Sequence, residues 1–283
     1  MTRPRASLLI NLANRVVPMR ILSFFFIILV SVTGFAQAHE FWISPQEYRV
    51  ARDGQLVAHI RVGQQFKGGT YSYLPPKFVR FDLVMGDQVF PVPGLMGDKP
   101  ALTMAAPAEG LATVVHETTD YLLTYSEAEK FVSFVTHKGF DGVLARHKAR
   151  GLPETGFRER YSRYGKSLIA VGNGAGTDRT VGLETEIVAL ANPYTDDLTA
   201  GFPVQVFYQG LPRQMAQVEV FEKSPDGTVS VTVHRTDAKG QVVLPVRKGH
   251  EYLVDAVVMR ELDANAENGP VWESLWASLT FAY

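Results

Sequence analysis

The stretch GQLVAHIRVGQQF, residues 54–66, indicates the fold class of this 283-residue chain. Every second residue from Leu56 to Val62 is apolar, and the polar side chains of His59 and Arg61 lie between them. This period of two is typical of a β-strand that buries one face. We therefore predict a strand here, with its apolar face packed in a core.

Similar short patterns continue on the C-terminal side of this stretch. The segment KFVRFDLVMGDQVFPVPG, residues 77–94, has two strand patterns around the turn Gly86-Asp87, and LATVVHETTDYLLTY, residues 111–125, has two more. Short strands separated by Gly, Pro and Asp are typical of an antiparallel sandwich. The fold class that follows is mainly β.

The pattern becomes helical at Ser126. Ser126 and Glu129 form a capping box, and three apolar residues from Phe131 to Val135 follow at helical spacing. The segment 139–151, GFDGVLARHKARG, continues as a second short helix that ends at its last glycine, and FRERYSRYG, residues 157–165, is open to the same interpretation. We predict a short helical insert over residues 126–165.

Strand patterns resume in KSLIAVG, residues 166–172, and LETEIVAL, residues 183–190. Turn-forming residues then gather in ANPYTDDLTAG, residues 191–201, and we place a domain boundary between residues 191 and 192. An N-terminal β-rich domain over residues 39–191 would carry the helical insert.

The remaining residues, 192–283, have strand patterns at near-regular spacing. Hairpin signals occur at Asp226-Gly227 and Lys239-Gly240, and the chain ends in the strand pattern SLWASLTFAY. We predict an immunoglobulin-like β-sandwich over this range, so that the whole chain is a two-domain β-sandwich.

Residues 1–38 have the order of a secretory signal peptide. Arginines precede the apolar run ILSFFFIILVSVTGFA, residues 21–36, and Ala36-Gln37-Ala38 is an A-x-A cleavage site. The alternative, a membrane anchor, needs about 20 apolar residues, which is more than this run contains. We expect cleavage after Ala38 and a periplasmic location, with translation starting at Met1 or Met19.

The charge balance and the absence of cysteine exclude several partners and sites. Formal net charge is -1, and removing residues 1–38, which hold four arginines and no acid, leaves 24 basic and 29 acidic residues. A chain with this balance lacks the basic surface that phosphate backbones require, so we expect no nucleic-acid partner. Without cysteine there is no disulfide, no thiolate metal site and no lipoprotein attachment.

Cleavage after Ala38 would make His39 the first residue of the mature chain. Its α-amino group and the Nδ1 atom of its imidazole can then close a chelate ring on one metal ion. This pair of nitrogen donors suits Cu(II) and Ni(II), and also Co and Zn. The alternative is that His39 merely follows the cleavage site and forms an ordinary hydrogen bond.

No histidine belongs to a local metal motif, so the fold would have to bring further ligands to His39. We take His59, within a strand, and His250, after a turn glycine, as candidate partners, although a packed or surface position also explains each. His137 suits the end of a helix, and His147 lies among basic residues typical of a solvated face. The other histidines are His116 and His234.

Motifs of ordinary hydrolases and nucleotide-binding enzymes do not occur in the sequence. It contains no G-x-S-x-G or H-E-x-x-H, and GNGAGTD, residues 172–178, lacks the lysine and the following helix of a phosphate loop. Glu184 and Glu186 share one strand face, which alone is weak support for hydrolysis. We therefore predict no catalytic residue.

Five segments together resemble a bacterial periplasmic family of unknown function that is grouped with the substrate-specific components of nickel and cobalt uptake. They are AHEFWISP at 38–45, HIRVGQQFKGG at 59–69, ERYSRYGKSLIAVG at 159–172, LETEIVALANPY at 183–194, and GHEYLVDAV with WESLWASLTF at 249–257 and 272–281. The resemblance covers nearly the whole mature chain. It implies a secreted β-rich protein that begins His-Glu-Phe-Trp, has an immunoglobulin-like C-terminal domain and binds metal, a property carried over to His39 only.

These observations lead to one functional hypothesis and two alternatives. We expect a periplasmic binding or delivery protein for a divalent transition metal, nickel or cobalt first and copper next, that has a metal transporter of the cell envelope as its partner. No apolar stretch after residue 38 approaches 18 residues, so we expect no integral membrane segment in the mature chain. The alternatives are a metal-free structural or interaction module of the envelope and a copper oxidase with a histidine brace, which needs a second histidine near His39.

Overall fold

Alternating side chains give the largest sheet two apolar faces. The computed structural model describes residues 1, 39–263 and 269–283, so the predicted signal peptide and its cleavage site lie outside the described residues. On β10 (Arg158–Val171), the consecutive residues Leu168 and Ile169 are fully buried in two different hydrophobic cores. Because neighbouring residues of a strand point to opposite faces, these cores lie on opposite sides of the sheet.

Ten strands of the described residues form this large sheet. Its order is β15-β14-β17-β18-β10-β8-β5-β6, and β2 and β9 also pair with β10. Strand β10 pairs in parallel with β18 and antiparallel with β8. The bounds of the other strands are β2 (Arg49–Val50), β5 (Phe78–Met85), β6 (Gln88–Pro91), β8 (Gly110–Thr118), β9 (Tyr121–Thr124), β14 (Gln217–Lys223), β15 (Val229–Arg235), β17 (Glu251–Glu261) and β18 (Pro270–Ala282).

A smaller four-stranded sheet covers each face of the large sheet. The first has the order β1-β3-β4, with β7 also paired to β3, and the second has the order β11-β12-β13, with β16 paired to β12. Ile43 and Leu56 of the first sheet pack in the core that contains Ile169, while Phe202 and Val204 of the second pack in the core that contains Leu168. The bounds are β1 (Glu40–Pro45), β3 (Gln55–Gln64), β4 (Lys67–Tyr71), β7 (Leu102–Ala105), β11 (Thr185–Ala189), β12 (Phe202–Tyr208), β13 (Leu211–Pro212) and β16 (Gln241–Leu244).

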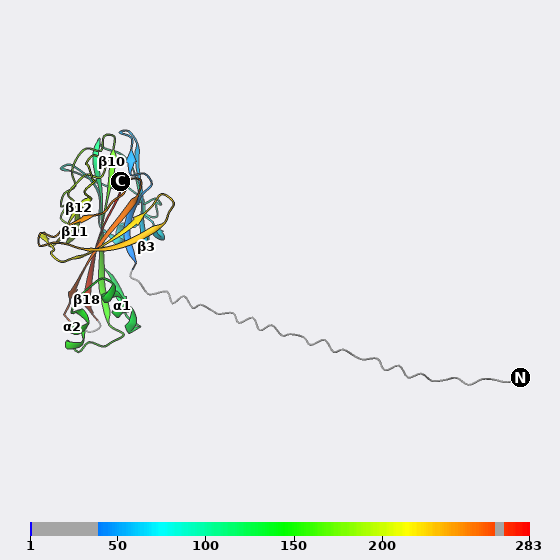
Figure 1. Ribbon diagram of the computed structural model, residues 1–283, viewed down its shortest axis with the longest axis vertical. Helices are drawn as coiled ribbons and strands as arrows, with labels where there is room; N and C mark the ends of the chain where they lie inside the picture. The colour runs from blue at the N-terminus through cyan, green and yellow to red at the C-terminus, as the bar shows by residue number, and fades with distance from the viewer. Residues whose placement is uncertain (2–38, 264–268) are drawn as a thin grey trace. The chain divides into compact units, whose positions relative to one another are not determined.

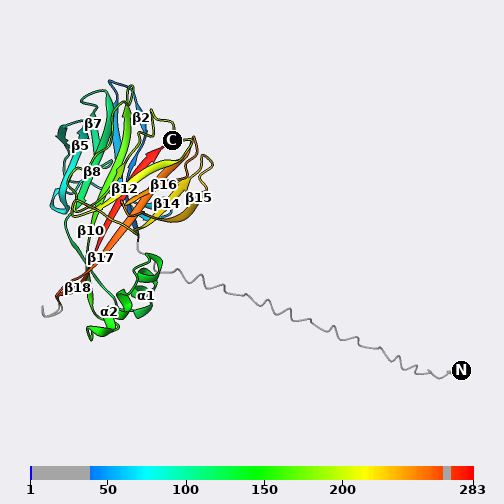
Figure 2. The same ribbon diagram turned by 60° about the vertical axis from the view of Figure 1, so that its left-hand side comes forward.

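The helices lie at one end of the long strands. Figures 1 and 2 show β10, β17 and β18 extending beyond the layered part toward α1 (Ala128–His137) and α2 (Val143–Ala149), and a 3-10 turn, η1 (Pro75–Lys77), precedes β5. Phe131 and Phe134 of α1 pack in an aromatic core with Trp272 and Trp276 of β18. The predicted mainly β class with a short helical insert is confirmed.

Two of the three predicted hairpin turns are confirmed, and one is wrong. The turns at Gly86-Asp87 and Asp226-Gly227 are confirmed, because they join the paired strands β5 and β6, and β14 and β15. The hairpin predicted at Lys239-Gly240 is wrong, since β15 pairs with β14 and β16 pairs with β12 in another sheet. That turn carries the chain from one layer to the next.

The helical insert is shorter than the predicted range. Residues 158–165 belong to β10, and hydrogen bonds to β18 and β9 override their local helical pattern. The predicted capping box is also wrong, because the N-cap of α1 is Glu127 and forms no side-chain capping bond. As predicted, α2 ends just before Gly151, whose φ of 66° is the left-handed conformation that stops a helix.

Strand pairing crosses the boundary predicted between residues 191 and 192. Strands β11 and β12, on either side of it, pair with each other, and β10 pairs with β18 over the register from Arg158 to Ser167. The described residues from His39 onward belong to one compact unit. Within the described residues, no helix is long and apolar enough to span a membrane.

Candidate functional site

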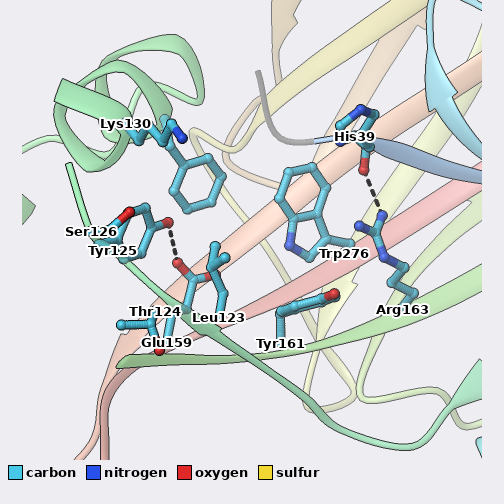
Figure 3. A pocket seen from close by; sticks show the side chains of 11 residues that line it. His39, Leu123, Thr124, Tyr125, Ser126, Lys130, Glu159, Tyr161, Arg163 and Trp276 are labelled. Atoms are coloured by element: carbon cyan, nitrogen blue, oxygen red, sulfur yellow. Dashed lines mark hydrogen bonds between the residues drawn. The ribbon is translucent and has the colours of Figure 1, made fainter. Parts of the chain in front are cut away.

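A cavity of about 300 Å³ lies where α1 and the start of β1 meet over the same face of the large sheet. The helix contributes Lys130 and Phe134, and His39, the residue just before β1, also lines the cavity. Figure 3 shows the side chains that line it: His39, Leu123, Thr124, Tyr125, Ser126, Lys130, Phe134, Glu159, Tyr161, Arg163 and Trp276. Aromatic rings and a few charged groups therefore line one cavity.

The floor of the cavity comes from two neighbouring strands. On β10, Glu159, Tyr161 and Arg163 are two residues apart, and such residues share one face of a strand. On β18, Trp276 is directly opposite Arg163 in the parallel register. The alternation of β10 thus brings an acid, a phenol and a guanidinium to the same cavity.

Arg163 is the buried cation of this site. Only 8% of its surface is exposed, and its Nη1 atom donates a hydrogen bond of 2.7 Å to the carbonyl oxygen of His39. Its guanidinium carbon lies 5.2 Å from the ring centroid of Trp276 and 5.3 Å from that of Tyr161. Burial lowers the pKa of Arg163, since no carboxylate of the described residues forms an ion pair with it.

Glu159 lies farther along the same strand face and is 2% exposed. The hydroxyl of Tyr125 donates to its Oε2 atom at 2.5 Å, and the hydroxyl of Ser274 donates to Oε1. Ser274 in turn accepts a 2.8 Å hydrogen bond from Nε1 of Trp276. Burial raises the pKa of Glu159 to about 7, although these hydrogen bonds and the charge of Arg163 oppose the rise.

A buried charge cluster lies beside this cavity, behind Trp276. The Nζ atom of Lys138 donates to Glu219 at 2.9 Å and to Asp255 at 2.8 Å, and it lies 4.9 Å from the ring centroid of Trp276. Burial, together with the negative charge of Asp255, raises the pKa of Glu40 to about 7. This cluster ties the end of α1 to β14 and β17.

The turn between β3 and β4 holds the start of β1 in place. Gln65 and Phe66 have φ values of 49° and 61°, a left-handed conformation that is uncommon outside glycine. The backbone N–H of Gln65 donates to Oε2 of Glu40 at 3.1 Å, and the ring of Phe66 packs edge-on against Trp42 at 6.0 Å. Backbone strain of this kind persists only where surrounding contacts determine the conformation.

A second cavity, of about 100 Å³, lies on the other side of Arg163. His116 lines it within an aromatic group, with ring centroids 4.5 Å from Phe78 and 4.9 Å from Phe81. Neither ring nitrogen of His116 has a hydrogen-bond partner among the described residues. Burial lowers the pKa of His116 to about 3, so its imidazole is neutral at physiological pH.

The structure does not bring the three predicted metal ligands together. His39 is exposed at the start of β1, whereas His59 of β3 pairs with Ser44, five residues further along β1 and thus about 17 Å away. The Nδ1 atom of His250 lies 2.9 Å from Glu222. Within the described ranges, no group of three or more histidine and acidic residues is arranged to hold a metal ion.

The remaining histidines have structural surroundings. His137 ends α1 as predicted, and its hydrogen bond to Glu219 raises its pKa. The solvated position predicted for His147 is wrong: this side chain is buried, accepts a 2.9 Å hydrogen bond from Nε1 of Trp272, and donates to the carbonyl of Pro153. His234 contacts Thr232 on β15.

Sequence reasoning missed Arg163, Glu159 and Trp276 as members of one site. The segment that contains Arg163 and Glu159 was predicted to be helical, and the period of two from Glu159 through Tyr161 to Arg163 was the available signal. Trp276 joins them only through the pairing of β10 with β18, which are separated by about a hundred residues.

Comparison with known proteins gives a family but no activity. A family model described as a domain of unknown function, DUF4198, matches residues 36–260. No curated protein matches the chain. A crystal structure of a tetra-tandem repeat in the extending region of a large adhesion protein is similar with 10% sequence identity and a TM-score of 0.20, over 86% of this chain and 49% of that chain. This chain thus spans about half the length of that structure.

Proposed function

This chain belongs to the DUF4198 family of unknown function. We propose that it is an exported binding or delivery protein for a divalent transition-metal ion. In this proposal, cleavage after Ala38 makes His39 the metal-binding residue. The ion is nickel or cobalt first and copper next, and a metal transporter of the cell envelope receives it.

The observation that carries the proposal is the way His39 is presented. Its side chain is exposed at the edge of the cavity, while its carbonyl oxygen is held by the buried Arg163. The residues that follow, Phe41, Trp42 and Ile43, are all buried. An anchored terminus with an exposed imidazole is suited to bind an ion, because little conformational entropy is lost when the chelate ring closes.

The donor set fits the ion in part. The α-amine and the Nδ1 atom of His39 supply two nitrogen donors, which suit the tetragonal geometry of Ni(II) and Cu(II). Glu40 is not free to become a third donor, since it is buried and accepts a hydrogen bond from Gln65. The remaining positions would be filled by water or by a small molecule, which fits reversible delivery better than permanent storage.

The arrangement favours binding over the alternative of a copper oxidase. A histidine brace needs a second imidazole beside the first, and His39 is the only histidine among the described residues that line this cavity. His116, which faces the smaller cavity, lies behind the ring of Phe41 at a centroid distance of 5.4 Å.

Calorimetric titration of the processed protein with Ni(II), Co(II) and Cu(II) tests the proposal. We expect one ion per chain, and a form whose α-amino group is acetylated should bind at least about tenfold more weakly because the amine can no longer donate to the ion. The variant His39→Ala should lose binding as well.

The variant His59→Ala provides the matched control. Its side chain lies about 17 Å from His39 along the β1–β3 pair, so its removal should leave the affinity unchanged. Equal binding by the processed protein and the acetylated form would disprove the proposal.

A further inference from the structure

We propose that the 300 Å³ cavity between α1 and β1 binds a small organic carboxylate with a flat aromatic body, anchored by Arg163 and packed against the aromatic side chains that line the cavity. His39 lines the same cavity, but this proposal does not depend on the proposed metal function, because it rests on side chains that are present whether or not a metal is bound.

Arg163 carries a buried positive charge that no ion pair of the described residues compensates. Arg163 is 8% exposed and is costly to bury without a carboxylate partner, yet no acidic side chain of the described residues forms an ion pair with it. Asp255 binds Lys138, and both oxygens of Glu159 accept hydrogen bonds from Tyr125 and Ser274. The polar contact of the guanidinium itself within the described residues is the carbonyl of His39, so donors remain for an anion.

The side chains that line the cavity are mostly aromatic or apolar. Trp276 and Tyr161 are both in contact with the guanidinium and line the cavity (Figure 3), and Tyr125 and Phe134 line it as well. Small-molecule sites combine such apolar and aromatic walls with a few polar groups that orient the ligand. An aromatic ligand can pack against such walls in edge-to-face contacts, and a planar carboxylate matches the two parallel N–H donors of arginine.

The charges that line the cavity favour one negative charge on the ligand. Lys130 stands at the α1 side and is paired with Glu127 at 2.8 Å, which leaves Arg163 as the cation available inside. A single buried guanidinium compensates a monoanion better than a dianion. The volume is at the lower end of the range of roughly 300–1,000 Å³ for small-molecule sites, so the ligand has the size of a one- or two-ring acid.

Two pairs of probes test this proposal: benzoate with benzamide, and indole-3-acetate with indole-3-acetamide. Each is titrated into the purified protein by calorimetry at pH 6, where Glu159 is mostly protonated, with EDTA present so that no metal contributes. We expect saturable one-to-one binding of at least one acid. Its amide, which lacks the charge, should bind about 10- to 100-fold more weakly.

Variants then locate the site. Arg163→Met keeps an apolar stem of similar length and should reduce carboxylate binding by about the same 10- to 100-fold, while Arg163→Lys, which keeps the charge but not the two parallel donors, should give an intermediate loss. Arg52→Met, at a side chain that is 80% exposed, is the control and should bind as the unaltered protein does.

The acid–amide comparison needs no variant, so it stands even if Arg163→Met fails to fold. Equal affinity for an acid and its amide would overturn the proposal. So would undiminished binding by a folded Arg163→Met protein, or the absence of saturable binding for all four probes. Failure of the metal titration would leave this result unaffected, because EDTA is present throughout.

Discussion

Replacing Glu159 by glutamine should change how the stability of the protein depends on pH. Burial raises the pKa of this carboxyl from 4.5 to about 7 in the folded protein. The folded state therefore holds a proton that the unfolded state has already released between these values. Stability falls as the pH rises through this window, because the unfolded state binds fewer protons there.

The size of the effect follows from the pKa difference. A tenfold change in proton affinity corresponds to about 1.4 kcal/mol, so the interval from 4.5 to about 7 corresponds to about 3 kcal/mol for a group that is 2% exposed. Glutamine cannot ionise, so Glu159→Gln should remove this contribution to the fall in the free energy of unfolding with rising pH. The variant also alters the hydrogen bonds with Tyr125 and Ser274, a change that shifts stability equally at every pH.

Urea unfolding followed by tryptophan fluorescence at pH 5, 6, 7 and 8 measures the effect. The free energy of unfolding of the unaltered protein should fall by about 3 kcal/mol more between pH 5 and 8 than that of Glu159→Gln. Glu154→Gln, at an exposed position, is the control and should keep the original slope. Parallel curves for the unaltered protein and Glu159→Gln would refute this account of the buried carboxyl.

Two further substitutions test buried side chains outside the cavity. Lys166→Met should destabilise the protein by about 3–5 kcal/mol in urea unfolding, because it leaves the carboxylates of Asp178 and Glu186 buried without their cation, whereas Lys148→Met on the exposed face of α2 should have little effect. Trp42→Ala should cost about 3–5 kcal/mol in the same assay, since the ring is 1% exposed, and a loss below 1 kcal/mol would contradict the view that it anchors β1.

The sequence predicts those parts of the fold whose pattern is local. The alternation at residues 54–66 indicates β3, which spans Gln55–Gln64, and the helical spacing of Phe131, Phe134 and Val135 indicates α1. Each of these patterns arises from one element that buries one face. A single element's own residues are sufficient to show it.

The sequence did not predict the secondary structure of residues that depend on partners distant in the chain. The segment 158–165 has aromatic and charged residues compatible with either a helix or a strand, and its pairing with β18 decides between them. The same pairing brings Trp276 to Arg163, so the cavity could not be inferred from either segment alone. His39 could be proposed from the sequence because its predicted chemistry depends on a neighbouring cleavage pattern rather than on the fold.

The burial of Leu168 and Ile169 in opposite cores has a consequence for cooperativity. Both outer sheets rest on the same strand, so removing β10 from its place exposes apolar surface on two sides at once. Each small sheet forms a sandwich with the large sheet. Because the two sandwiches share that sheet, neither can separate from the other while its own core remains intact. The described part of residues 35–283 should therefore unfold in a single transition, and a substitution in β10 is felt in both halves of the protein.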